Sequence, residues 1–245
     1  MTRFSAREKA ILAGLYLSKF DQEGLRHLGF DSFAEAFNVI GLALNARPAS
    51  IKNYRDEFDP VFPNKRQGWH KREMRAYVKE VYDQFHALNL RDLSNLIKEI
   101  VYKKPEIDLL TENIGDKNSF AKRLLTGLSA ENYFEHNYHK IDVFKECKIE
   151  NTTKYGCGFD FKLNLQNSVF IAVEVKGLNE SSGSVLLTEK EHSVAKILNE
   201  RYFLFVVKNF KETPFHEIVQ NPLNSDLIFE KRESLIKKYS WSCNV

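Results

Sequence analysis

Two neighbouring segments in the C-terminal half of the chain alternate between apolar and polar residues, and this pattern constrains the fold more than any other. Residues 159–165 carry apolar side chains at odd positions and polar ones at even positions. Residues 169–176 carry β-branched side chains at odd positions, and Glu174 and Lys176 at even ones. A period of two is typical of a β-strand, in which successive side chains point to opposite faces. The sequence therefore predicts a hairpin of two strands.

The register of this hairpin follows from its apolar face. If the odd-numbered side chains of both strands share one face, odd positions must pair with odd positions. The loop must then hold an odd number of residues, and residues 166–168 provide such a loop. The predicted pairs are Phe161 with Val173, Leu163 with Ile171, and Asp160 with Glu174.

The paired carboxylates of Asp160 and Glu174 predict a metal site. Directly opposed residues of an antiparallel pair have Cβ atoms about 4.5–5.5 Å apart. Carboxylates this close repel each other unless a cation lies between them, and Mg²⁺ prefers such oxygen ligands. Lys176 lies on the same face, about 6.6–6.8 Å along the strand, within reach of a metal-bound water or a phosphate oxygen. A metal, a polarised water and a cation near a phosphate together make a phosphodiesterase site. The alternative is that these three residues are exposed on the sheet and form salt bridges without any catalytic role.

The elements around the hairpin are expected in the order α-β-β-β-α-β. Tyr202 to Val207 is apolar throughout, which is typical of a strand inside a sheet. Thr188 and Glu191 form a capping box for the helix before it. Gly158 and Gly177 are expected to leave room for a bulky backbone to approach. The remaining predictions are a helix at 119–136, a strand at 143–150, a helix at 188–199 and a helix near Glu217.

The N-terminal part predicts helices only, because its apolar residues recur at helical spacing. Ser32 and Glu35 are expected to form a capping box. A composition change at 104–119 places the boundary between an all-helical domain, 1–110, and an α+β domain with a mixed central sheet, 111–245. The predicted N-terminal helices cover 5–20, 33–44, 50–58, 71–86 and 90–102.

The helix at 33–44, the break at Pro48 and the short helix at 50–58 have the outline of a helix-turn-helix, although any small helical bundle has a similar outline. If Ile51, Tyr54 and Phe58 face inward, the opposite face is suited to contact phosphates and base edges. The predicted DNA-binding residues on that face are Ser50, Lys52, Asn53 and Arg55.

Composition excludes some classes of protein. The net charge of +3 does not by itself indicate nucleic-acid binding, but residues 47–76 hold eight Lys and Arg against four acids. This basic stretch is consistent with a surface that contacts a phosphate backbone. Three cysteines are too few and too scattered for a disulfide framework or a four-ligand zinc site. No apolar run reaches the roughly 18–20 residues of a membrane span, and no signal peptide is evident, so an intracellular protein is expected.

Three motifs together resemble the PD-(D/E)xK nuclease superfamily and, more narrowly, the Mrr-like domain of restriction systems. They are Gly-Phe-Asp-Phe at 158–161, Ala-Val-Glu-Val-Lys-Gly at 172–177 and Leu-Leu-Thr-Glu-Lys-Glu at 186–191. The resemblance covers residues 119–210. It implies that Asp160 and Glu174 bind the metal and that Lys176 positions or deprotonates the attacking water. It also implies that Glu131 supports the metal from the preceding helix. The chain departs from the family pattern in having Ala130 where glycine is usual, and in lacking a proline before Asp160.

The resemblance implies a restriction endonuclease, either sequence-specific or modification-dependent, that cleaves double-stranded DNA with Mg²⁺ or Mn²⁺ in the cytoplasm of a prokaryotic cell. Because cutting both strands needs two active sites, a homodimer is expected. Two alternatives remain open. One is a non-catalytic DNA-binding regulator with a nuclease-like fold. The other is a nuclease for repair or for RNA, acting on flaps, ends or single strands.

Overall fold

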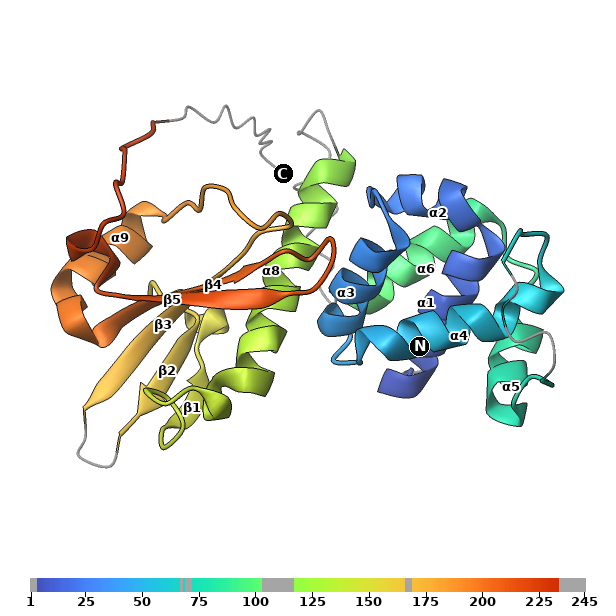
Figure 1. Cartoon of the computed structure of the whole chain (residues 1–245), viewed down its shortest axis with the longest axis horizontal. Helices are drawn as coiled ribbons and strands as arrows, with labels where there is room; N and C mark the ends of the chain where they lie inside the picture. Colours follow the sequence, from blue (N-terminus) through green and yellow to red (C-terminus); the bar gives the residue numbers. More distant parts are fainter. Residues whose placement is uncertain (1–3, 67, 69–71, 103–116, 166–168, 234–245) are drawn as a thin grey trace, which may run out of the picture.

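The structure is a computed structural model that describes residues 4–66, 68, 72–102, 117–165 and 169–233. Helices make up the N-terminal part, and a five-stranded mixed sheet lies in the C-terminal part (Figure 1). The predicted α+β fold class is therefore confirmed. The predicted domain boundary falls at residues outside this description. Among the described residues, no helix is long and apolar enough to cross a bilayer.

The N-terminal helices surround α1, whose residues 10–18 are all buried. Ser5 and Glu8 form a capping box at its start. A Cβ atom on Gly14 would lie 2.5 Å from Cβ of Tyr54, so α1 and α4 pack too closely there for a larger residue. The sequence predicted all of these helices except α2, and α5 begins later than expected. Their bounds are α1 Ala6–Lys19, α2 Asp21–Leu28, α3 Phe33–Ala43, α4 Pro48–Phe58, α5 Ala76–Phe85 and α6 Leu90–Tyr102.

The sheet has the strand order β1-β2-β3-β4-β5. Neighbouring strands are antiparallel except β3 and β4, which are parallel. Helix α9 (Glu189–Leu198) makes the crossover between these two. The strands are β1 Lys148–Asn151, β2 Phe161–Asn164, β3 Phe170–Gly177, β4 Tyr202–Lys208 and β5 Phe215–Gln220.

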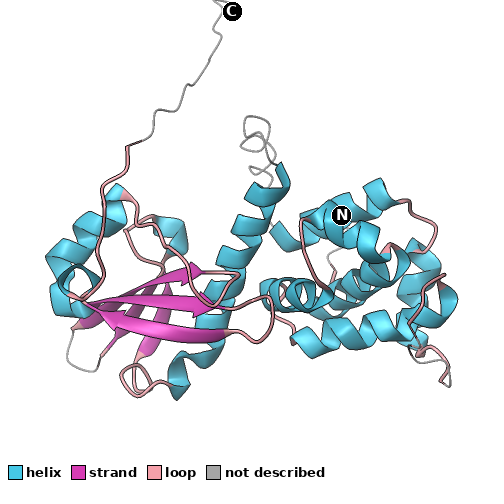
Figure 2. Cartoon of the chain, turned by 45° about the horizontal axis from the view of Figure 1, so that its top comes forward, coloured by secondary structure: helices cyan, strands magenta, loops and turns pink. Residues whose placement is uncertain are grey.

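The two faces of the sheet are covered by different helices (Figure 2). On one face, the ring of Phe134 from α8 (Lys117–Asn137) lies 4.9 Å from Phe161 and 4.8 Å from Phe205. On the other face, Ala195 of α9 packs with Ala172 and Tyr202. Odd positions of β3 therefore face α8, and even positions, including Glu174, lie on the α9 side.

The predicted register is confirmed: Phe161 pairs with Val173, and Leu163 pairs with Ile171. The Leu165 amide donates to the carbonyl of Val169 at 3.1 Å, so the ladder reaches the end of the hairpin. The loop at 166–168 lies outside the described residues.

Two predicted elements are wrong. Most of the strand expected at 143–150 is a series of turns, because Phe144 and Cys147 are buried at a spacing of three and only 148–151 pairs with β2. The helix expected near Glu217 is strand β5, in which Glu217 pairs with Val206. Pairing with the buried strand β4 outweighs the local helical tendency of that segment.

Helices α3 and α8 join the two parts of the chain. Asn38 donates from Nδ2 to the carbonyls of Phe210 and Glu212, both at 2.8 Å. Glu35 is fully buried and pairs with Lys122 Nζ of α8 at 2.8 Å. Only half of the predicted Ser32 capping box forms, because the Glu35 carboxylate accepts from the Asp31 amide instead. One face of α3 is thus occupied by α8.

Candidate active site

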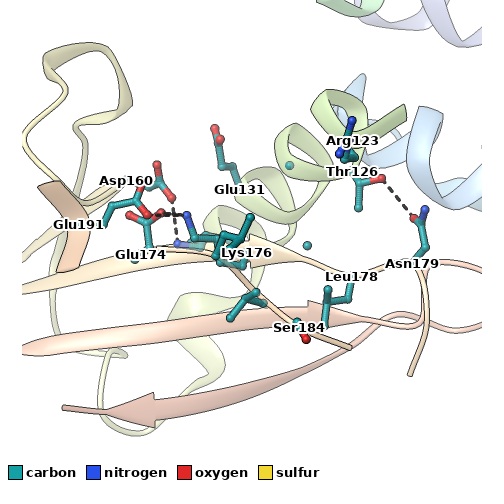
Figure 3. Close-up of a pocket in the computed structure, with 15 residues that line it drawn as sticks. Arg123, Thr126, Glu131, Asp160, Glu174, Lys176, Leu178, Asn179, Ser184 and Glu191 are labelled. Atoms are coloured by element: carbon teal, nitrogen blue, oxygen red, sulfur yellow. Dashed lines mark hydrogen bonds and ion pairs between the residues drawn. The ribbon is translucent and has the colours of Figure 1, made fainter. Parts of the chain in front are cut away.

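A cavity of about 550 Å³, here called the β3 cavity, opens beside the C-terminal end of β3 (Figure 3). Four carboxylates line it, each from a different part of the chain: Glu131 from α8, Asp160 from just before β2, Glu174 from β3 and Glu191 from α9. Lys176 lies among them. The other lining residues are Arg123, Thr126, Gly127, Val175, Gly177, Leu178, Asn179, Ser184, Val185 and Leu186.

Asp160 lies close to Glu174, although the pairs of β2 and β3 begin at Phe161 and Val173 and do not include the predicted pair of Asp160 with Glu174. The amide of Asp160 donates to the carbonyl of Val173 at 3.1 Å, one residue out of the register of the β2–β3 pairs. Its carboxylate Oδ2 accepts from the Val175 amide at 2.9 Å. The structure therefore brings the predicted trio Asp160, Glu174 and Lys176 together in one cavity.

Burial disfavours the negative charge of both paired carboxylates. Glu174 is only 3% exposed, and burial, with the nearby charge of Asp160, raises its pKa to about 8. Burial raises the pKa of Asp160 to about 6, although the Val175 amide and the Lys176 charge act in the opposite direction. The two carboxylates are thus held where their ionised forms need more positive charge than the described side chains supply.

The ammonium of Lys176 contacts two carboxylates. Its Nζ lies 2.5 Å from Glu174 Oε1 and 2.8 Å from Glu191 Oε2. Burial acts to lower the pKa of Lys176, but the charge of Glu174 and the hydrogen bonds to both glutamates outweigh it and raise the pKa above its usual value. A lysine that keeps its proton is suited to position a water or a phosphate oxygen. It is poorly suited to act as a general base.

Glu131 also reaches the site. Its side chain points into the β3 cavity from α8 (Figure 3). A Cβ atom on Gly177 would lie 2.7 Å from the carbonyl oxygen of Thr126, so a glycine is needed for α8 to approach this closely. Gly158 has φ +91°, and a Cβ atom there would lie 2.8 Å from Val194 of α9. The room predicted at both glycines is therefore filled by helices of the chain itself.

Two charged residues of the cavity were not predicted as site residues. Glu191 was recognised as part of a capping box and of the motif at 186–191, but it was not assigned a role in the site. Arg123 lies eight positions before Glu131 in α8, which is just over two turns, so the two share a helix face. Helical spacing from Glu131 could have identified it.

The donor set fits a divalent cation through the Asp160 and Glu174 pair. Mg²⁺ is commonly held by one or two carboxylates, with waters and substrate phosphates completing its shell. A cation would also offset the cost of burying these two charges. Within the described residues, no three His, Cys, Asp or Glu side chains form a cluster that could hold a metal ion. Cys147 and Cys157 are free thiols.

The predicted DNA-binding helix is α4, and the structure supports only part of its predicted face. Lys52 and Asn53 are exposed and Ser50 is half-buried, whereas Arg55 is only 8% exposed. The prediction for Arg55 is therefore wrong. Its guanidinium lies over Phe33 and Phe37, with centroid distances of 4.7 and 4.9 Å. Position 55 is four residues after the buried Ile51, so it lies on the buried face of α4. The long side chain of Arg55 therefore packs over aromatic rings.

The basic stretch at 47–76 is not mainly a free cationic surface. Arg66 pairs with Asp59 and Asp21, and Arg75 pairs with Glu57. Together with Arg55, these arginines bind acids of the same helical part. Residues 67 and 69–71 of this stretch lie outside the described residues.

Comparison with known proteins gives one family match. Residues 130–219 match the family described as Protein NO VEIN, C-terminal. No curated protein and no solved structure was found to match the chain. The NO VEIN C-terminal match begins beside Glu131 and ends in β5, so it contains all four carboxylates and Lys176. It leaves α1–α6 outside.

Proposed function

We propose that this protein is a metal-dependent endonuclease that hydrolyses phosphodiester bonds of double-stranded DNA at a PD-(D/E)xK-type site. The observation that carries the proposal is the convergence of Asp160, Glu174 and Lys176 on one cavity. Strongly raised pKa values of two adjacent carboxylates in a cavity are common at catalytic sites. If the charged residues of the cavity served only as structural ion pairs, the four carboxylates would not need to outnumber the two cations, Lys176 and Arg123.

Asp160 and Glu174 are the residues that would hold the metal. A bound Mg²⁺ or Mn²⁺ would supply an activated water and neutralise phosphate charge. The protonated Lys176 would donate to a phosphate oxygen and stabilise the negative charge that develops there during hydrolysis. Glu131 would accept a hydrogen bond from the attacking water and orient it. No side-chain nucleophile is required.

DNA would contact the protein at two places. Arg123 lies at the opposite end of the β3 cavity from Glu191 (Figure 3), where it can bind a second phosphate of the strand. Ser50, Lys52 and Asn53 on α4 would provide the recognition contacts. A homodimer would supply the two active sites that double-strand cleavage needs. A restriction enzyme, sequence-specific or modification-dependent, fits these parts best.

The direct test is cleavage of methylated and unmethylated plasmid, with and without Mg²⁺, by the wild-type protein and by Asp160→Ala. Discrete fragments that need Mg²⁺ and disappear in Asp160→Ala are the expected result. Glu150→Gln is a matched control, because Glu150 pairs across the sheet with Lys162 at 3.8 Å but does not line the cavity. This control should cut like the wild type.

Other outcomes would contradict the proposal in distinct ways. DNA binding without any metal-dependent cleavage would support a non-catalytic regulator. Cleavage restricted to flaps, ends or single strands would support a repair nuclease. Equal loss of cleavage in Glu150→Gln and Asp160→Ala would show that the sheet is generally sensitive to charge, and that the cavity has no special role.

A further inference from the structure

The Lys176 ammonium is held by two carboxylates, here called its anchors, and the proposed function makes one of them a metal ligand. Glu174 Oε1 and Glu191 Oε2 both contact the ammonium. If Glu174 serves as a metal ligand, its oxygen is no longer fully available to Lys176. The remaining anchor is then Glu191.

Glu191 is held rigidly by the start of α9. The Thr188 amide donates to Glu191 Oε2 at 2.9 Å, and the Glu191 amide donates to Thr188 Oγ1 at 3.2 Å. The same Oε2 atom accepts from Lys176 at 2.8 Å. The capping box therefore fixes the oxygen that the lysine contacts, and the first turn of a helix favours a negative charge.

The position of α9 relative to the sheet is fixed as well. The close approach of Val194 to Gly158 sets the helix directly against the segment that leads to Asp160. Tyr202 of β4 donates from its hydroxyl to the carbonyl of Gly158 at 3.1 Å. The segment that carries Asp160 and the helix that carries Glu191 are thus held in one packed unit.

We propose that Glu191 is a positioning residue for Lys176: it holds the ammonium at the cavity when Glu174 is engaged by a metal. This inference rests on the proposed function for its purpose, but the Glu191–Lys176 contact can be tested in the metal-free protein. Glutamine is accepted at the same capping-box position, so Glu191→Gln removes the charge and keeps the helix start.

The test is competitive acetylation of the metal-free protein in a Glu174→Gln background, which removes the charge of the other anchor as a bound metal would occupy it, with the exposed Lys154 as internal reference. In Glu191→Gln, the acetylation rate of Lys176 relative to Lys154 should rise about tenfold, the scale of a lost charge-assisted hydrogen bond. Thr188→Ala is the structural control, because it weakens the cap and leaves the Glu191 carboxylate in place. It should lower the melting temperature and leave Lys176 acetylation near the rate of Glu174→Gln alone.

An unchanged acetylation rate in Glu191→Gln would overturn the proposal, as would an equal rise in Thr188→Ala. Glu191→Asp keeps the charge but shortens the side chain, so Lys176 acetylation should rise there too. In the Mg²⁺-loaded enzyme, Glu191→Gln should lower kcat about 10–100-fold, with KM for DNA little changed. If acetylation responds as expected but the wild type cuts no DNA, the positioning role stands and the nuclease proposal fails. If the wild type cuts and acetylation does not respond, the reverse holds.

Discussion

The N-terminal helices and the β3 cavity both bury charged side chains, but they do so in opposite ways. In the helical part, Asp59 binds Arg66 at 2.7 Å, and Glu57 binds Arg75 at 2.5 Å. The hydrogen bonds that both arginines donate to these acids raise the pKa values of the arginines, so the charged forms are favoured. Each buried charge there has a matched partner.

In the β3 cavity, four carboxylates share a space with Lys176 and Arg123. The pKa values of Asp160 and Glu174 are raised, so their charged forms are disfavoured. The difference teaches that buried ion pairs in this protein have two roles. Matched pairs fix helix packing, whereas an excess of acid marks a place that can accept a cation.

The largest expected effect comes from replacing a buried glutamate by glutamine, which can be done both in the β3 cavity and in the helical part. Glu174→Gln should reduce cleavage by at least about 10³-fold, the scale of removing a catalytic group. It should also stabilise the metal-free protein above pH 8, because it removes a buried charge that its surroundings disfavour. Activity assays and thermal melts of the metal-free protein would measure both effects.

Glu57→Gln should have the opposite effect on stability. It removes the carboxylate that Arg75 contacts, and it should destabilise the protein by about 1–3 kcal/mol while cleavage stays near wild type. Destabilisation by both substitutions would remove the contrast between the two regions.

The second prediction concerns pH. Because the folded-state pKa values of Asp160 and Glu174 lie above their usual values of 3.8 and 4.5, their contribution to stability is full below those usual values. It is lost as the pH rises through about 6 and about 8. Each pKa unit corresponds to about 1.4 kcal/mol, so the loss is on the order of a few kcal/mol.

Mg²⁺ should reverse this loss, because it binds the ionised carboxylates. The increase in melting temperature caused by Mg²⁺ should therefore grow from pH 5 to pH 8, across the range set by these pKa values. An Asp160→Asn/Glu174→Gln double variant should show almost no increase. A Mg²⁺ response that is independent of pH would contradict the cation role of this pair.

The third prediction separates a structural arginine from a surface lysine on α4. Arg55→Ala should destabilise the protein by about 1–3 kcal/mol, because it removes a packed guanidinium from Phe33 and Phe37. Lys52→Ala should leave the melting temperature unchanged and weaken DNA binding. Denaturant melts and DNA titrations on both variants would test this, and the reverse result would restore Arg55 as a DNA contact.

The smallest effect is expected at Arg123, the cation at the far end of the cavity. Arg123→Gln should weaken DNA binding a few-fold and reduce the slope of log K against log salt by about 0.9, the value for one phosphate contact. Lys154→Gln, an exposed lysine outside the cavity, is the control and should leave the slope unchanged. Equal slopes for all three proteins would exclude Arg123 as a phosphate contact.

Much of the fold could be predicted from the sequence where periodicity was strong. The helices at 33–44, 90–102 and 188–199 appear close to their expected bounds, as does the buried strand β4. The failures lie where the pattern was short or weak. The segment around Glu217 became an edge strand only because β4 was available to pair with it.

For the candidate site, the sequence by itself determined the hairpin. A strand with one apolar face has one acceptable register, since a slip of one residue would turn that face to the other side. That rule alone brought Asp160 beside Glu174 and set Lys176 on the same face. Only the tertiary structure decided that Glu191 and Arg123 join them and that Arg55 does not face outward. These outcomes depend on how α9, α8 and α3 pack, and contacts between elements far apart in the chain leave no local period in the sequence.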